Sequence, residues 1–281
     1  MTTFLIVFFI CFCKSNSFLP IIQEKSLLLH SNSIFIVPFY FSIFIKTMSL
    51  YLIPVPLGDT PIDQVLPPYN RDVILSLRHF IVENVRSARR FLKKVEPSID
   101  IDALTFYELN EHTPSSAVEG FLQPLMEGHS MGLISEAGCP AVADPGADVV
   151  ALAQRRGIEV VPLVGPCSMV LALMASGFNG QRFAFHGYLP TEAHARRARL
   201  RELESRAYAD DQTQLFIETP YRNIRMLSDI LSACRPSTRL CVAAGLTCPD
   251  AYAVTRTVAE WHRTPPPPID KVPCIFLLYR G

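Results

Sequence analysis

The chain has 281 residues, of which 49% are apolar and 19% are charged, and its formal net charge is +0. This length is enough for two domains of ordinary size, and the composition excludes a disordered polyelectrolyte, which has few apolar residues and a high net charge. The balance of 26 basic and 26 acidic residues excludes attraction to nucleic acid or membranes through bulk charge, so any such partner must be bound by a local patch.

Residues 1–47 are strongly apolar and are expected to lie outside the working fold. Their apolar runs at 4–13 and 34–41 are shorter than the roughly 20 residues that a membrane-spanning helix needs. The first run could belong to a secretory signal, but no basic residue precedes it and no small-x-small cleavage site follows it. Met48 resembles a start that leads directly into a buried strand, so the favoured interpretation is an N-terminal extension over residues 1–47.

From residue 50 onward, short apolar runs alternate with helical patterns, and the order of strands, loops and helices up to residue 168 is typical of an α/β domain with a mainly parallel sheet. We expect two α/β domains, residues 48–180 and 181–281. The expected helices are 87–95, 114–127, 147–156, 192–208 and 224–232. The expected strands are 50–55, 105–109, 131–135, 159–164, 182–187, 214–218, 239–244, 251–257 and 274–279.

The eight cysteines do not predict a metal site. No C-x-x-C pair occurs with a second pair or with a histidine partner, which zinc sites usually have. Cys234, Cys241 and Cys248 recur every seven residues and could suggest a ligand set, but ordinary buried or loop thiols are the favoured interpretation. A reduced protein in the cytoplasm, with no metal and no stable membrane partner, is the simplest expectation.

The loops after three of the expected strands are rich in small residues. Gly58 follows the first strand, Gly138 and Gly146 follow the strand at 131–135, and Gly165 and Ser168 follow the strand at 159–164. Ligands of open α/β sheets bind beyond the carboxyl ends of the strands, and small residues let the backbone approach them closely. Each loop alone could be a plain tight turn, but three that converge would form a pocket for a ligand with an adenine, a ribose and a chain. No phosphate-binding motif of the G-x-x-x-x-G-K-[ST] or G-x-G-x-x-G type occurs.

Six strings along the chain are informative together and in this order: P-L-G-D (56–59), V-E-N-V-R-S-A-R-R-F-L (82–92), S-E-A-G-C-P-A-V-A-D-P-G (135–146), V-G-P-C-S-M (164–169), F-H-G-Y-L-P (185–190) and E-T-P-Y-R-N (218–223). They resemble the tetrapyrrole methylase superfamily, and more narrowly ribosomal RNA small-subunit methyltransferase I and its short relatives, which use S-adenosylmethionine. The family usually has Asp at Glu136, Thr at Cys139, Ser at Cys167, and Glu-Asp-Thr-Arg at residues 83–86. These departures bear more on the substrate than on the cofactor.

The resemblance implies two tetrapyrrole methylase-like α/β domains with S-adenosylmethionine folded in the cleft between them. A sulfonium group is neutralised by carbonyls and carboxylates, and an adenine needs flat apolar walls, so the residue types agree with this cofactor. The residues that the resemblance places around it are Leu57, Gly58, Ser135, Glu136, Ala137, Gly138, Asp144, Cys167, Ser168, Phe216, Glu218, Ala243 and Ala244.

Methyl transfer to a hydroxyl depends on positioning of the acceptor and is helped by a base. The candidate catalytic residues are Glu83, Arg86 and Glu111. Glu83 and Arg86 could orient a ribose or simply form an ion pair. His112, beside Glu111, could instead cap a helix, and Glu218 is more suited to shaping the cleft.

Two basic stretches could bind RNA although the net charge is zero. The first contains Arg86, Arg89, Arg90, Lys93 and Lys94, and the second contains Arg196, Arg197, Arg199 and Arg201. Either stretch could be only a solvated helix face, and the first is favoured as an RNA contact.

The leading hypothesis is methylation of a ribose 2′-hydroxyl in the RNA of the small ribosomal subunit by a protein that is a homodimer by family analogy. One alternative is methylation of a small molecule such as a tetrapyrrole, because a fold alone does not determine the substrate. The other is a non-catalytic module that binds the cofactor or the ribosome.

Overall fold

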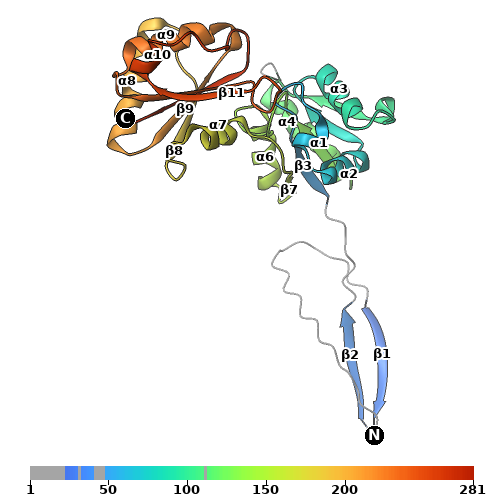
Figure 1. Cartoon of the computed structure of the whole chain (residues 1–281). Coiled ribbons are helices and arrows are strands. Elements are labelled where there is room, and N and C mark those ends of the chain that lie inside the picture. Colours follow the sequence, from blue (N-terminus) through green and yellow to red (C-terminus); the bar gives the residue numbers. More distant parts are fainter. Residues whose placement is uncertain (1–22, 31–32, 41–47, 111–112) are drawn as a thin grey trace. The chain divides into compact units, whose positions relative to one another are not determined.

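The computed structural model describes residues 23–30, 33–40, 48–110 and 113–281, and the chain divides into two compact units, residues 1–47 and 48–281. In the first unit, β1 (Gln23–His30) pairs with β2 (Ser33–Tyr40) as an antiparallel hairpin (Figure 1). Within the described ranges, every helix is too short or too polar to span a membrane. The role of residues 1–47 stays a prediction.

The second unit begins with a five-stranded sheet in which all paired strands are parallel, in the order β5-β4-β6-β3-β7. All four residues of the central strand β6 are buried, as expected for a parallel strand that is covered on both faces. The strands are β3 (Ser49–Ile53), β4 (His79–Val82), β5 (Thr105–Glu108), β6 (Met131–Ile134) and β7 (Glu159–Pro162).

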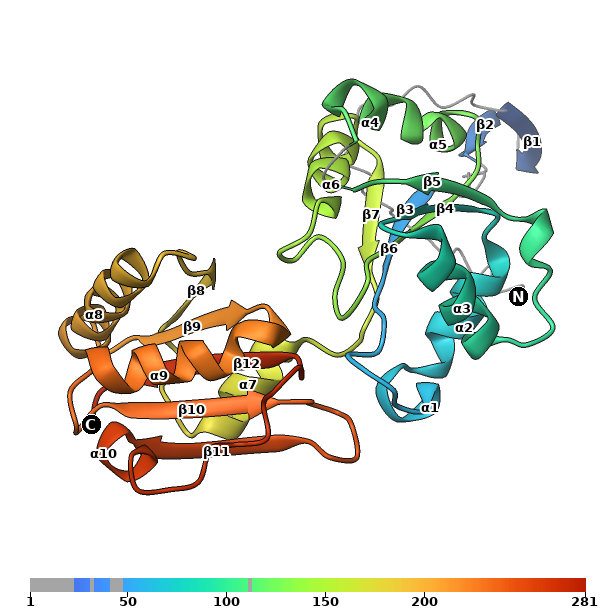
Figure 2. The same cartoon turned by 90° about the horizontal axis from the view of Figure 1, so that it is seen from above.

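Helices cover both faces of this sheet (Figure 2). Alternate side chains of β4 show the division, since Phe80 and Val82 pack against one group of helices and Ile81 packs against the other. One face carries α1 (Ile62–Val65), α2 (Pro68–Ser76), α3 (Val85–Val95) and the 3-10 turn η1 (Ile101–Ala103). The other face carries α4 (Ser115–Phe121), α5 (Gln123–Met126) and α6 (Gly146–Arg155).

The expected helix at 114–127 is therefore two helices. Pro124 lies at the start of α5, where its missing N–H and fixed φ are tolerated but where α4 cannot continue through it.

The second sheet has the order β11-β10-β12-β9-β8 and is mainly antiparallel, with only β8 and β9 running parallel. The mainly parallel sheet expected for the first half is thus confirmed. In the second sheet, the short β10–β11 loop joins neighbouring strands directly, which antiparallel pairing allows. The strands are β8 (Phe183–Tyr188), β9 (Thr213–Glu218), β10 (Arg239–Ala244), β11 (Tyr252–Thr257) and β12 (Cys274–Tyr279).

One face of this sheet packs against α8 and α9, and the other packs against α7, whose Ala172 belongs to the same buried cluster as Leu215 and Ala243. Although α7 precedes residue 180, it packs on the second sheet, and the domain boundary near that residue stays a prediction. The helical elements are α7 (Ser168–Ser176), α8 (Ala193–Ala209), η2 (Pro220–Arg222), α9 (Asn223–Ala233) and α10 (Val258–Trp261).

The centre of the first sheet has no room for a side chain at Gly132. A Cβ atom there would lie 2.6 Å from Ile53 Cδ1 and 2.8 Å from Phe80 Cδ1. We expect Gly132→Ala to lower the free energy of unfolding by about 1–3 kcal/mol, because overpacking displaces core side chains. Urea unfolding followed by circular dichroism measures this change.

Gly120→Ala is the control, since Gly120 lies in α4 and a Cβ atom there would meet nothing within 4 Å. We expect this substitution to raise the free energy of unfolding by roughly 0.5–1 kcal/mol, because alanine loses less backbone entropy than glycine. Equal effects of the two substitutions would contradict the packing described for β6.

Candidate functional site

The loops that follow the parallel strands leave the carboxyl edge of the first sheet. β4 and β6 are neighbours in this sheet, but β4 continues into α3 on one face and β6 continues into α6 on the other. The chain therefore turns away in opposite directions from two adjacent strand ends. In open α/β sheets, this arrangement creates the crevice in which ligands bind.

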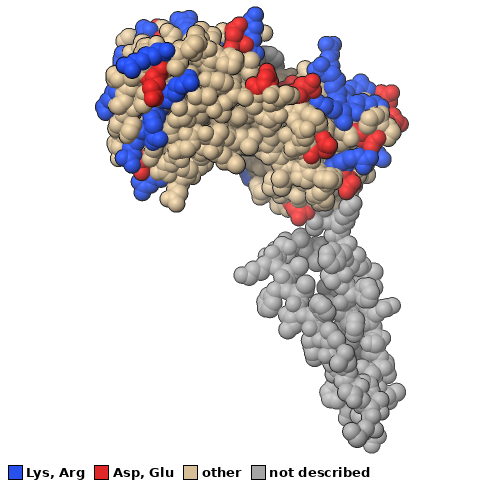
Figure 3. All heavy atoms as spheres, viewed as in Figure 1, with Lys and Arg blue, Asp and Glu red and all other residues tan. Residues whose placement is uncertain are grey.

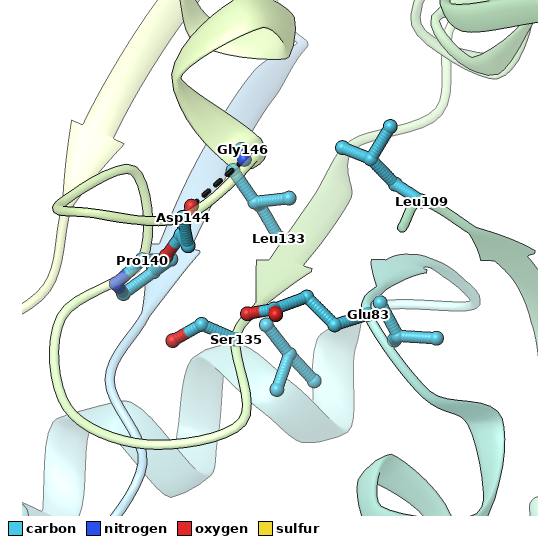
Figure 4. A pocket seen from close by; sticks show the side chains of 9 residues that line it. Glu83, Leu109, Leu133, Ser135, Pro140, Asp144 and Gly146 are labelled. Carbon is cyan, nitrogen blue, oxygen red and sulfur yellow. Dashed lines mark hydrogen bonds between the residues drawn. The ribbon is translucent and has the colours of Figure 1, made fainter. Parts of the chain in front are cut away.

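A cavity of about 10 Å³ lies at this crevice. Its volume suits a single water molecule, so it cannot enclose a larger ligand. Three predicted site residues, Glu83, Ser135 and Asp144, line it together (Figure 4). The remaining lining residues are Val82, Leu109, Leu133, Ile134, Pro140 and Gly146.

Ser135 is the first residue after β6 and is only 7% exposed. Its hydroxyl oxygen is buried and has no hydrogen-bond partner among the residues that the structure describes. Buried polar atoms in folded proteins are nearly always hydrogen-bonded, so an unpartnered one beside a cavity indicates that a ligand or water completes its bonding.

Glu83 is the first residue after β4 and is half-buried. Burial raises the pKa of Glu83, the hydrogen bond from the Glu136 N–H lowers it, and the negative charges of Asp144 and Glu136 raise it further. The Glu136 N–H donates to Oε1 of Glu83 over 3.1 Å, while Oε2 has no partner within the described part of the chain. One carboxylate oxygen is thus fixed and the other is available.

Asp144 shapes the loop between β6 and α6. Its Oδ1 accepts hydrogen bonds from the N–H groups of Ala141, over 2.9 Å, and Gly146, over 2.7 Å. These bonds hold a loop in which Ala141 and Ala143 have φ values of 64° and 63°, a conformation that costs energy for residues with a side chain. Burial raises the pKa of Asp144 against the lowering effect of these hydrogen bonds.

The edge carries negative charge that is not neutralised locally. Among the described residues, no lysine, arginine or histidine forms an ion pair with Glu83, Glu136 or Asp144. Glu136 accepts a hydrogen bond from the hydroxyl of Ser87 in α3 over 2.5 Å. Three acidic side chains without a cation make this edge suited to a positively charged ligand.

Gly138 joins the loop after β6 to the loop after β3. Its N–H and C=O pair with the backbone of Val55 over 3.0 and 2.9 Å, and its φ of 76° favours glycine. Leu57 lies directly against it, since a Cβ atom at Gly138 would be 3.2 Å from Leu57 Cδ2. Glu136 and Ala137, in the same loop, are exposed.

The loop after β7 meets these two loops. The sulfur of Cys139 lies 3.5 Å from the carbonyl oxygen of Pro166, and Cys167 directly precedes α7, which begins at Ser168. Cys167 and Ser168 are both half-buried. The structure thus brings together the predicted site residues of the first half of the second unit, around residues 57–58, 135–144 and 167–168.

The loop after β10 contacts the loop after β3. The buried Thr60 donates its hydroxyl hydrogen to the carbonyl oxygen of Thr247 over 3.0 Å. A Cβ atom at Gly58 would lie 2.4 Å from the sulfur of Cys248. The segment that follows Ala244 therefore reaches the predicted site.

The predicted residues of the second sheet lie at its inner positions. Phe216 is fully buried and stacks on Phe276, and Ala243 and Ala244 are each 1% exposed. Glu218 is buried and ion-paired with Arg222, whose Nη2 lies 2.6 Å from Oε1. Paired in this way, Glu218 holds the turn after β9 and is not placed as a free base.

The remaining catalytic candidates are less well placed. Arg86 is exposed and forms no ion pair with Glu83 within the described residues, while Glu111 and His112 lie outside those residues. The sequence prediction missed Leu109 and Leu133, which line the cavity, and Ser87, which binds Glu136. Only the positions of Leu109 and Leu133 near strand ends could have indicated these two residues.

The first basic stretch lies on α3, where Lys and Arg side chains gather together with acidic ones (Figure 3). Arg89 pairs with Asp102 over 2.6 Å, and Lys94 pairs with Asp59 over 2.8 Å. Arg86 and Arg90 are exposed, one helical turn apart, with no acidic partner in the described part of the chain.

The second basic stretch is partly internal, which corrects the prediction of an exposed arginine patch. Arg196 is 1% exposed and binds Asp229 through Nε and Nη2, so its side chain links α8 to α9. Arg197 also pairs with Asp229, over 3.1 Å, and Arg199 pairs with Glu202 over 2.5 Å.

A scan against protein-family models found no match. In a comparison with curated proteins, the chain is 31% identical over 198 residues to a protein of Vibrio cholerae named ribosomal RNA small subunit methyltransferase I, which covers 70% of this chain and 65% of that protein. It is also 31% identical over 196 residues to the protein of the same name from Xylella fastidiosa, covering 70% of this chain and 67% of that protein. The chain thus spans about 65% of the length of the first of these relatives.

Among solved structures, the chain resembles the methyltransferase CobJ, with a TM-score of 0.55 and 16% identity over 84% of this chain and 94% of that one. It resembles cobalt precorrin-4 methyltransferase, CbiF, to the same TM-score of 0.55, with 15% identity over 85% of this chain and 98% of that one. These two likenesses confirm the expected tetrapyrrole methylase-like α/β fold. The sequence identity of 31% to the Xylella protein over 67% of its length shows that the chain belongs to the ribosomal RNA small subunit methyltransferase I family.

Proposed function

We propose that this protein is an S-adenosylmethionine-dependent methyltransferase that acts on a ribose 2′-hydroxyl of small-subunit ribosomal RNA. The observation that carries this proposal is the 31% identity, over 70% of the chain, to proteins that bear that name. The site supports it, because a half-buried carboxylate and an unpartnered hydroxyl meet at the crevice between β4 and β6.

The residues at the carboxyl edge fit S-adenosylmethionine, which supplies a methyl group on a positively charged sulfur. Glu83, Glu136 and Asp144 provide negative charge that no cation of the described residues neutralises. The cavity of about 10 Å³ is too small for the cofactor, so the cofactor would lie across the loops above it, near Leu57, Gly58 and residues 135–138. Cys167 and Ser168 would then border it from the loop after β7.

In this proposal, Glu83 takes the proton that a hydroxyl loses when it is methylated. Its Oε1 is fixed by the Glu136 N–H, and its Oε2 is available within the described part of the site. Its raised pKa makes the carboxylate a better proton acceptor than an ordinary glutamate, because a base is most effective when its pKa is close to the working pH.

RNA binding is assigned to the exposed face of α3, with Arg86 and Arg90 as its free cations. The small ribosomal subunit is the proposed partner, and the cytoplasm is the proposed location. A homodimer is proposed by family analogy.

We expect the purified chain to transfer a labelled methyl group from S-adenosylmethionine to small ribosomal subunits. Alkaline hydrolysis should leave the labelled nucleotide in an uncleaved dinucleotide, because a 2′-O-methyl group blocks strand cleavage. Glu83→Gln should lower the rate of transfer by about 10²–10⁴-fold, as is usual for loss of a general base. Calorimetry with S-adenosylhomocysteine should show that the variant still binds the cofactor product.

The control for this variant is Glu119→Gln, an exposed glutamate on α4 outside the cavity, which should leave the rate unchanged. Labelling of a base instead of a ribose, or full activity of Glu83→Gln, would contradict the proposed chemistry.

The pKa values of Glu83 and Asp144 also predict how stability depends on pH. Both are raised in the folded chain, so the folded state retains these protons to a higher pH than the unfolded state does. The stability that this contributes is present below the unfolded pKa values and is lost as the pH rises through the folded ones. Glu83→Gln has no proton to lose, so its melting temperature relative to the natural chain should rise as the pH increases above the ordinary glutamate pKa of 4.5.

Differential scanning calorimetry of the natural chain, Glu83→Gln and the exposed control Glu119→Gln measures this difference. A difference for Glu83→Gln that falls as the pH rises would show that burial does not penalise the charged form of Glu83.

The exposed face of α3 predicts salt-dependent binding. The double substitution Arg86→Glu and Arg90→Glu should weaken binding to small ribosomal subunits and reduce the slope of log K against log salt concentration by about 2, since two phosphate contacts are lost. Filter binding over a range of salt concentrations measures both quantities. Arg263→Glu, an exposed arginine outside both basic stretches, is the control and should leave the slope unchanged, whereas an equal loss in both variants would indicate a general charge effect.

A further inference from the structure

Two free thiols lie where the loops after β6 and β7 meet. The sulfur of Cys139 is 3.5 Å from the carbonyl oxygen of Pro166 and 4.0 Å from that of Gly165, so it lies against the residues that directly precede Cys167. The backbones also touch, because a Cβ atom at Gly138 would be 3.5 Å from the Pro166 oxygen. Both cysteines are half-buried and unbonded to any other sulfur.

Cys139 and Cys167 are close enough to affect each other. Burial raises the pKa of the Cys139 thiol, and the neighbouring Cys167 raises it further. Cys139 is therefore a weak nucleophile, so the first attack is assigned to Cys167, which directly precedes α7.

The other described thiols are in different surroundings. Cys234, Cys241 and Cys274 are buried in the second sheet and its helices, and burial raises the pKa of Cys234 to about 12. Such thiols react slowly, because the thiolate is the reactive form. Cys248, the remaining thiol, is half-buried and lies beside Gly58 and Thr60.

We propose that Cys139 and Cys167 form a reversible disulfide, a redox modification site between two of the loops that are proposed to bind the cofactor. The oxidant is a low-molecular-weight disulfide. The Cys167 thiolate attacks one of its sulfurs, the S–S bond of the oxidant breaks and one thiolate leaves. The Cys139 sulfur, after losing its proton to solvent, attacks the sulfur of Cys167 and displaces the second thiolate. Two protein thiols are oxidised and one disulfide is reduced to two thiols.

The new bond would change the cofactor site, and this part of the inference rests on the proposed function. A disulfide holds its two sulfurs much closer than two thiols in contact, so its formation draws the loop of Gly138 and the loop of Pro166 together. Leu57 packs on Gly138, and Val55 pairs with its backbone, so both would move with Gly138. Oxidation should therefore lower the affinity for the cofactor, and reduction should restore it.

The test uses the full chain, first reduced and then treated with oxidised glutathione. Peptide mapping by mass spectrometry should find one disulfide that joins the peptides of Cys139 and Cys167, with a mass about 2 Da lower for the loss of two hydrogens. Dithiothreitol should reverse it. Calorimetry with S-adenosylhomocysteine should show at least a tenfold weaker affinity for the oxidised chain, on the order of the differences that loop rearrangements cause.

Matched variants separate this pair from the other thiols. Cys139→Thr and Cys167→Ser should each prevent the disulfide and keep the affinity constant under oxidation, while Cys248→Ser, the change of another half-buried thiol, should leave both effects in place. A disulfide that includes Cys248, or a stable glutathione adduct on both Cys139 and Cys167, would overturn the inference. If the disulfide forms but the reduced chain does not bind S-adenosylhomocysteine, the modification site is supported and the proposed function is contradicted. If the reduced chain binds S-adenosylhomocysteine but no disulfide forms, the modification site is contradicted and the proposed function is unaffected.

Discussion

The site depends on the parallel pairing of β4 with β6. Because these neighbouring strands continue into helices on opposite faces of the sheet, no helix can cover both of their carboxyl ends. Glu83 and Ser135, the first residues after each strand, are thereby held side by side although they are far apart in the sequence. The remaining loops of this edge only complete a crevice that the strand order has already opened.

Burial of acidic groups without cations is the second constraint. A half-buried carboxylate is costly to ionise, and Glu83 is also repelled by Asp144 and by the exposed Glu136. The chain accepts this cost at Glu83 and Asp144, although it neutralises Glu218 with Arg222 and Asp229 with two arginines elsewhere. Charge is therefore balanced where it supports the fold and left unbalanced where a cationic ligand is proposed to bind.

Much of this arrangement could be predicted from the residues. Alternating apolar runs indicated the strands, and the small-residue loops indicated the edge at which Glu83, Ser135 and Asp144 meet. The helix α7 could not be found in this way, because apolar residues occur on all its sides and leave no helical period. The burial of Arg196 was also hidden, since an arginine that pairs with an aspartate 33 positions later looks the same in the sequence as a solvated one.

Local chemistry was informative only where the partner was close in the sequence. The capping box of α10, in which Thr257 and Glu260 bond each other's backbone, is a signal within four residues that the sequence analysis passed over. The contact between Gly58 and Cys248 has no such signal. A side chain at position 58 would occupy the space of the Cys248 sulfur, which can turn about only one bond. A larger residue at position 58 is therefore compatible only with a smaller or reoriented side chain at position 248, 190 residues away in the sequence.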